Sequence, residues 1–142
     1  MANETQPGQL VSLLHATGTA VSYVESKLAT VGLSMAKLAA LECLAQAGES
    51  LPLGQLADRL ACVKSNVTQL VDRLEADNLV TRAADPSDRR ARLAVMTDVG
   101  REAFRRGQAI KDEAEREFFQ VLSAEELAQL STIVKKIETY RA

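Results

Sequence analysis

The stretch KSNVTQLVDR, residues 64–73, combines hydrogen-bonding side chains with apolar residues at helical spacing. Its apolar residues recur at three- and four-residue intervals, so they share one face of a predicted helix and leave the polar side chains on the other. Asn and Gln can each form two hydrogen bonds with adenine, whereas Lys and Arg favour guanine edges or phosphates. The pattern therefore predicts contacts with double-stranded DNA. A helix face that is only solvated is the alternative.

Within this stretch, we expect three polar side chains to contact bases: Ser65, Asn66 and Gln69. Lys64 and Thr68 lie near the start of the helix, where free amides and the helix dipole attract an anion, so we expect them to contact phosphates. Arg73 is a further candidate for DNA contact.

A second group of charged residues lies in a predicted β-hairpin. LVTRA and RLAVM alternate apolar and polar residues, as strands do, and the segment ADPSDRRA between them is rich in turn-forming residues. Arg89 and Arg92 are expected to contact phosphates, and Asp88 to orient an arginine, either Arg90 or Arg73. A hairpin whose charges serve only solubility is the alternative.

The rest of the chain predicts the helices that position these two groups. Ser34 and Thr97 have the residue types of helix N-caps, and Ser123 with Glu126 forms a capping box. Gly48 is suited to the left-handed conformation that ends a helix. Helical spacing of apolar residues predicts helices over 10–31, 34–47, 53–60, 64–78 and 97–120, and a last helix after Ser123.

Two helices joined by a short turn and followed by a hairpin predict a winged helix-turn-helix in a mainly α, α+β fold. We place this unit at residues 34–97, with the recognition helix at about 64–77 and the wing at about 79–97. At 142 residues, the chain has the length of a single domain.

The stretch 56–100 resembles the MarR family of bacterial regulators. Asp88-x-Arg90, followed by Met96-Thr97, is similar to the family's wing signature DxRxxxxxLT, and most of the chain follows the family's element order. The resemblance implies a triangular homodimer in which helices at 9–31 and 98–142 form the dimer and each winged unit binds half of a palindrome. It also implies that Arg90 enters the minor groove.

Three residues depart from the family pattern around the recognition helix and wing. Ala61 stands where the family usually has glycine, Val63 where a serine N-cap is usual, and Met96 where leucine is usual. We therefore expect a less conventional turn before the recognition helix. Its first amides would bond to water, Ser65 or a DNA phosphate.

The resemblance also implies regulation by a small ligand or an oxidant. The residues expected to line a pocket for a small aromatic or phenolic effector are His15, Tyr23 and Met35, although such residues are also common in cores. Cys62, beside the recognition helix, is a candidate redox sensor, and a small buried hydrophobe is the alternative. Cys43 is expected in the core.

Composition narrows the function classes further. The net charge of −2 is unusual for a DNA-binding protein, so the DNA-facing charge must be local. One histidine and two cysteines without ligand spacing predict no metal and no cofactor, and enzyme motifs are absent, so we expect no enzyme. Without a long apolar run or a leader pattern, we expect a cytoplasmic protein that contacts no membrane. The sequence thus predicts a DNA-binding transcriptional regulator, by default a repressor; a winged helix that binds proteins instead is the alternative.

Overall fold

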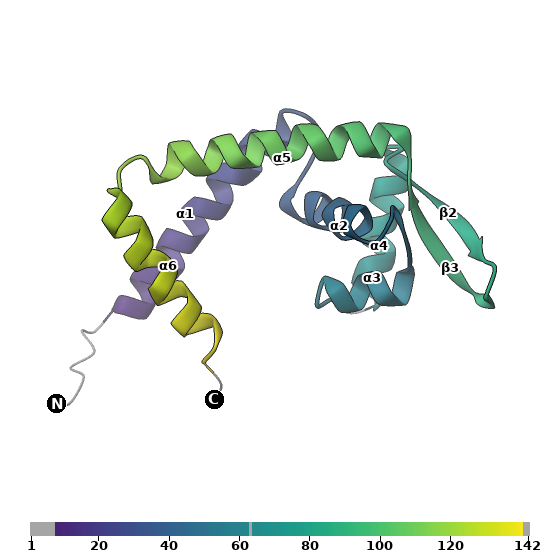
Figure 1. Ribbon diagram of the computed structural model, residues 1–142, viewed down its shortest axis with the longest axis horizontal. Coiled ribbons are helices and arrows are strands. Elements are labelled where there is room, and N and C mark those ends of the chain that lie inside the picture. The colour runs from purple at the N-terminus through teal and green to yellow at the C-terminus, as the bar shows by residue number, and fades with distance from the viewer. Residues whose placement is uncertain (1–7, 63, 141–142) are drawn as a thin grey trace.

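The computed structural model describes residues 8–62 and 64–140, and within them the chain forms six helices and three short strands (Figure 1). The helices are α1 (Gln9–Ala29), α2 (Met35–Gln46), α3 (Leu53–Arg59), α4 (Lys64–Ala76), α5 (Asp98–Phe119) and α6 (Ala124–Glu138). The strands are β1 (Ser50–Pro52), β2 (Val80–Asp85) and β3 (Asp88–Met96). The predicted mainly helical winged fold is confirmed.

Helix α5 connects two parts of the molecule (Figure 1). At one end of α5, helices α2, α3 and α4 pack together with the sheet, and the β2–β3 hairpin projects from them. At the other end, α1 and α6 extend away from α5 as two arms. Within the described residues, no helix has the length and apolar character needed to cross a membrane.

The predicted helix starts are formed by local hydrogen bonds. Ser34 Oγ accepts from the Lys37 amide at 3.1 Å, and Thr97 Oγ1 accepts from the Gly100 amide at 2.9 Å. Ser123 and Glu126 form the reciprocal capping box. These side chains satisfy amides that a helix start otherwise leaves unpaired, so the N-caps expected for α2, α5 and α6 are confirmed.

The core lies between α2, α3, α4 and the sheet. The largest completely buried side chains include Leu41 and Leu44 of α2, Leu56 of α3, and Val71 and Leu74 of α4. These residues recur at three- and four-residue intervals, so each helix turns one apolar face inward. The polar face of α4 is thereby fixed toward solvent.

The sheet is antiparallel, with strand order β1-β3-β2. Strands β2 and β3 pair from Val80↔Met96 to Asp85↔Asp88, and residues 86–87 form the turn between them. Strand β1 was not predicted, because three residues ending in a proline are too short for an alternating pattern. It pairs with the base of β3 and so anchors the wing to the core.

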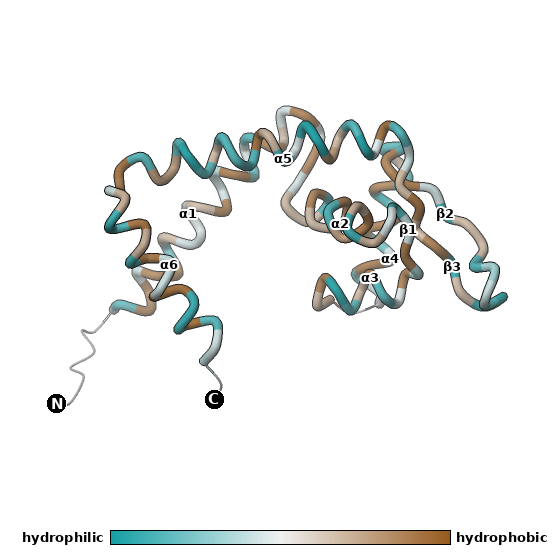
Figure 2. Tube along the Cα trace, in the orientation of Figure 1, coloured by the Kyte–Doolittle hydropathy of each residue, from teal (hydrophilic) through white to brown (hydrophobic). Residues whose placement is uncertain are grey.

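The apolar stripes of α1 and α6 are largely exposed in the single chain. Leu10 and Leu14 of α1 keep 70% and 61% of their surface, and Ile133 and Ile137 of α6 keep 53% and 51%. Figure 2 shows hydrophobic segments along both arms. The packing expected for these stripes is therefore not provided within one chain.

Candidate nucleic-acid interface

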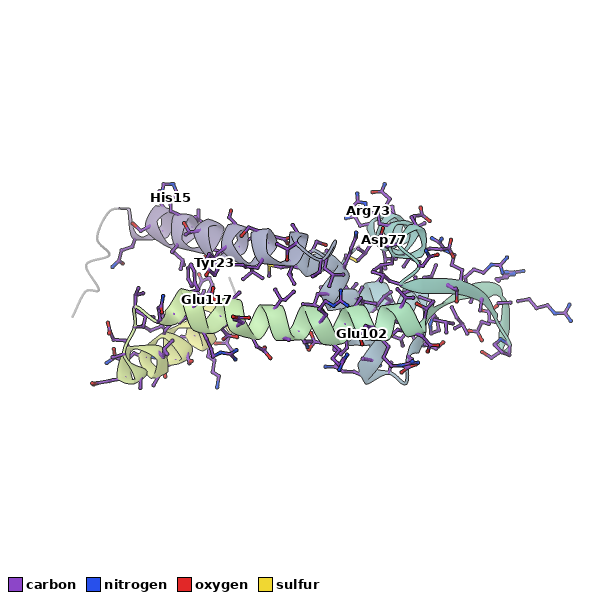
Figure 3. All side chains as sticks on the ribbon, turned by 90° about the horizontal axis from the view of Figure 1, so that it is seen from above. His15, Tyr23, Arg73, Asp77, Glu102 and Glu117 are labelled. Atoms are coloured by element: carbon purple, nitrogen blue, oxygen red, sulfur yellow. The ribbon has the colours of Figure 1, made fainter. Side chains whose placement is uncertain are left out.

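Helix α4 presents the predicted polar residues on its exposed face. Its exposed side chains include the following candidates: Ser65, Asn66, Thr68, Gln69 and Arg73. The intervening Val67, Val71 and Leu74 are buried, which fixes the rotation of the helix about its axis. Lys64 is the first residue of α4. Arg73 lies on the side of α4 away from α5 (Figure 3).

The turn before α4 contains a strained residue. Ala61 adopts a φ of 52°, in the left-handed region that favours glycine. The Ala61 amide donates to Asp58 O at 3.2 Å and the Cys62 amide to Ala57 O at 3.1 Å, so the chain turns tightly at the end of α3. These two bonds and the left-handed residue form the ordinary Schellman helix end, so the turn at Ala61 is unusual in its residue type and not in its geometry, whereas the expectation for Val63 lies outside the described residues.

The tip of the wing is held by two carboxylates. Asp85 accepts hydrogen bonds from the Ser87 hydroxyl at 2.7 Å and from the Ser87 amide at 2.9 Å, and these bonds hold the pKa of Asp85 below its usual range. Asp88 accepts from the backbone amide of Arg90 at 2.9 Å. Asp88 thus bonds to the main chain of Arg90, one of the two arginines that it was expected to orient, and its effect on the Arg90 side chain stays a prediction.

A groove of about 550 Å³ lies between α3, α4 and β3. Thr68 of α4 lines one side, and Arg90 and Arg92 of β3 line the other. Arg89 is not among the residues that line this groove, whereas its neighbours Asp88, Arg90 and Ala91 are. The structure thus brings two wing arginines together with the recognition helix at this groove.

The candidate arginines differ from their neighbour Arg82 in their partners. Within the described part of the chain, no ion pair is formed by Arg73, Arg89, Arg90 or Arg92, and all four are exposed. Arg82 instead pairs with two carboxylates of α4. The four exposed guanidinium groups therefore form a local surface of uncompensated positive charge in an acidic chain, and their contact with DNA stays a prediction.

Sequence reasoning missed two residues of this region. Gln55 of α3 is exposed and lines the groove with Arg90, but α3 has no polar pattern that distinguishes Gln55 from solvent-facing residues. Arg82 joins the wing to α4, and its partners lie seven and ten residues earlier in the chain. Only the spacing of acidic residues along α4, three apart at Asp72 and Glu75, gave a signal for such a pairing.

The three residues expected to line an effector pocket are dispersed in the chain. The Tyr23 hydroxyl donates to Glu117 of α5 at 2.5 Å, and this bond raises the pKa of Tyr23. His15, on the same helix, points away from α5 (Figure 3). Met35 begins α2, where its amide donates to Glu25 at 3.0 Å. The effector site remains a prediction.

The two cysteines are partly buried and free. Both pack against the core cluster, and burial raises the pKa of the Cys43 thiol, which favours its unreactive protonated form. The role of Cys62 as a redox sensor stays a prediction. Across residues 8–62 and 64–140, no group of His, Cys, Asp or Glu has an arrangement suited to a metal ion.

Known proteins share both the sequence and the fold. Residues 33–91 match the MarR family. The HTH-type transcriptional regulator MhqR of Bacillus subtilis is 32% identical over 108 residues, which cover 75% of this chain and 72% of that protein. The crystal structure of AbsC, a MarR family transcriptional regulator from Streptomyces coelicolor, aligns with a TM-score of 0.82 at 26% identity and covers 97% of this chain and 95% of AbsC.

A structure with DNA has the same fold. A mutant of the MarR protein of E. coli, crystallised with operator DNA, aligns with a TM-score of 0.78 at 23% identity, over 90% of this chain and 92% of that one.

Proposed function

The chain belongs to the MarR family of transcriptional regulators, and we propose that it is a homodimer that binds a palindromic operator in double-stranded DNA. It is a regulator and not an enzyme, since the relatives that it matches are transcriptional regulators. We propose which residues contact DNA, that the operator is a palindrome, and whether the protein represses or activates transcription.

The observation that carries this proposal is the convergence of α4 and β3 at one groove. Polar side chains of α4 face solvent beside Arg90 and Arg92, which are exposed and, in the described residues, free of ion pairs. A helix of this kind fits the major groove, and a cationic hairpin beside it reaches the adjacent minor groove. In the similar MarR structure, the bound molecule is operator DNA.

We divide the contacts by chemistry. Asn66 and Gln69 lie three residues apart on the exposed face of α4, so both can reach base edges from one side of the helix, together with Ser65. Lys64 and Thr68 contact phosphates near the start of α4. Arg90 enters the minor groove, where a narrow groove concentrates negative potential, and Arg89, Arg92 and Arg73 add phosphate contacts.

The exposed arms support the homodimer. Helix α6 buries none of its residues, although it carries Ile133, Val134 and Ile137 on one face. Exposed apolar stripes of this kind are typical of interaction surfaces, and burying apolar area is worth about 25 cal/mol per Å². A second copy of the chain, related by a two-fold axis, covers both arms with the same residues from each subunit.

Sedimentation equilibrium tests the dimer. The double variant Ile133→Glu/Ile137→Glu places charges on the proposed interface, so we expect the mass of one chain where the wild type gives the mass of two. Val99→Glu is the matched control, because Val99 is also exposed but lies at the start of α5, away from the arms. A double variant that stays dimeric contradicts the proposed interface.

Two-fold symmetry determines the operator. Two recognition helices related by the axis would enter major grooves about 34 Å apart, one turn of DNA, so the operator would be an imperfect palindrome. A dimer on such a site overlaps a promoter without further machinery, which favours repression. Because its proposed target is chromosomal DNA, we place the protein in the cytoplasm, without membrane contact.

We extend the proposal to release of DNA by a small aromatic or phenolic effector or by an oxidant. A ligand between the arms and the winged unit would shift the population toward a spacing of the two α4 helices that does not fit DNA. Thermal-shift measurements with small aromatic acids test the effector. Operator affinity before and after mild peroxide, in wild type and Cys62→Ser, tests the oxidant, and equal losses in both would exclude Cys62.

Selection from random duplex oligonucleotides tests DNA binding by the purified protein. We expect an enriched palindrome. Recovery of no enriched sequence would contradict the proposal and favour the alternative of a winged helix that binds proteins.

A further inference from the structure

Arg82 of β2 forms an ion-pair bridge to the outer side of α4. Its Nη2 donates to Asp72 Oδ1 at 2.5 Å and to the main-chain oxygen of Thr68 at 3.2 Å. Its Nη1 donates to Glu75 Oε1 at 3.1 Å, and the Arg82 amide donates to the second oxygen of Glu75, also at 3.1 Å. One residue of the wing is thus bonded to three residues of the recognition helix. We call Arg82, Asp72 and Glu75 the wing clamp.

In the wing clamp, the arginine side chain is less exposed to solvent than the two carboxylate side chains that it pairs with. The Arg82 side chain keeps 24% of its surface, whereas those of Asp72 and Glu75 keep 60% and 44%. A guanidinium has five N–H donors, and the bonds to Asp72, Glu75 and Thr68 occupy three of them. Arg82 therefore has little left to offer a phosphate, and its charge is already compensated.

Strand pairing within the hairpin links the position of Arg82 on β2 to the position of β3. Arg82 pairs with Ala94 of β3, and two residues further along β2, Ala84 pairs with Arg92. Fixing Arg82 on α4 therefore fixes the regular part of the ladder as far as Arg92, and Arg90 follows in the irregular stretch next to it. A guanidinium suits this task because its planar group donates to two carboxylates at once, which defines an orientation as well as a distance.

From this arrangement, and on the premise of the proposed DNA binding, we propose that Arg82 is a positioning residue that sets sequence specificity without contacting DNA. The wing clamp holds the wing arginines at one angle to Asn66 and Gln69, so base and groove contacts form together. Without the clamp, the wing still attracts phosphates, but it no longer aligns with the recognition helix. Non-specific binding depends on charge and tolerates such misalignment, whereas specific binding does not.

Two substitutions separate this role from a direct DNA contact. Arg82→Gln should weaken binding to the selected operator by about tenfold or more while binding to a random duplex and its salt dependence stay unchanged. A lost phosphate contact would instead weaken both and lower the slope of log affinity against log salt by about 0.9. Asp72→Asn should also weaken operator binding, even though it removes a negative charge from the DNA-facing helix.

Asp58→Asn is the matched control for Asp72→Asn. Asp58 lines the same groove and, within the described residues, forms no ion pair, so its removal takes away an anion without opening the wing clamp. We expect Asp58→Asn to raise operator affinity, because it removes a negative charge from the groove beside Arg90 and Arg92. If Asp72→Asn raises operator affinity as well, or if Arg82→Gln lowers the salt slope, the proposal for Arg82 is overturned.

Arg82→Lys keeps the test decisive if Arg82→Gln fails to fold. Lysine preserves the charge but cannot donate to both carboxylates in the planar geometry of a guanidinium, so a positioning role predicts a sequence specificity below that of the wild type. If Arg82→Lys keeps the sequence specificity of the wild type, the positioning role of Arg82 is contradicted. The wild-type protein is measured first: a wild type without sequence preference overturns the proposed function itself, whereas a specific wild type with an unaffected Arg82→Gln overturns only the role of Arg82.

Discussion

Gly100 of α5 packs directly on the main chain of Leu79, at the point where β2 begins. A Cβ atom on Gly100 would lie 2.0 Å from the Leu79 carbonyl oxygen, which is far inside van der Waals contact. Thr97 strengthens the same junction, because its hydroxyl donates to Asn78 O at 2.6 Å. The end of α4, the start of the wing and the start of α5 are therefore joined as one rigid corner.

Gly100→Ala should destabilise the protein strongly, because the atom in the way belongs to the backbone and cannot rotate aside. We expect at least about 1 to 3 kcal/mol, the usual cost of overpacking, measured by urea unfolding. Gly54→Ala is the matched control, since nothing lies within 4 Å of its added Cβ. Equal stabilities of the two variants would contradict the packing at Leu79.

The opposite effect is expected at Ala61. Its φ of 52° costs an L-residue about 1 to 2 kcal/mol, which glycine does not pay, so Ala61→Gly should raise the free energy of unfolding by roughly 1 kcal/mol. Ala109→Gly, in an exposed position within α5, should lower it by about 0.5 to 1 kcal/mol. A loss of stability at both positions would show that the turn before α4 does not hold Ala61 in this conformation.

Arg90→Ala tests the wing. If Arg90 contacts the minor groove, operator binding should weaken by about 1 to 3 kcal/mol at fixed salt, the range of a good specific contact. Arg105→Ala provides the control, because Arg105 is exposed on α5 and pairs with Glu102 of the same helix. Fluorescence anisotropy with a labelled operator measures both variants, and unchanged affinity in Arg90→Ala would remove this residue from the interface.

Stability should fall on acidification partly through Glu49. Hydrogen bonds from Arg101 hold the pKa of Glu49 below its ordinary value of 4.5. A carboxylate whose pKa is lower in the folded state stabilises the protein above the unfolded pKa, and this contribution disappears as the pH falls through the folded pKa. The melting temperature of the wild type should therefore exceed that of Glu49→Gln at pH 7, and the difference should shrink below about pH 4.5. A difference independent of pH would contradict the pair.

Much of the fold was predictable because its signals are local. The N-caps at Ser34 and Thr97, the alternation of strands β2 and β3, and the inward face of α4 all depend on residues within one or two turns of each other. Strand β1 had no such signal, because it exists only through its pairing with β3.

The candidate site was predicted less completely, since partner choice is a tertiary property. The alternating pattern and the turn-forming residues placed Arg90 and Arg92 in a hairpin, but only the fold shows that both line a groove with Thr68 while Arg89 does not. The spacing of Asp72 and Glu75 showed that two acids share one face of α4, but neither their ion pairs with Arg82 nor the bond of Asp88 to a backbone amide could be predicted from it. Arginines of the same hairpin thus differ in role because each has different neighbours in the folded structure.

The central claim is that the exposed face of α4 reads DNA sequence, and a specificity ratio tests it most directly. The measurement compares binding to the selected palindrome and to a scrambled duplex of equal length at one salt concentration, for wild type and for Asn66→Ala/Gln69→Ala. We predict a wild-type preference of about a thousandfold or more for the palindrome. The double variant should lose most of this preference while its affinity for the scrambled duplex stays unchanged. Equal affinities of the wild type for the two duplexes would contradict the claim.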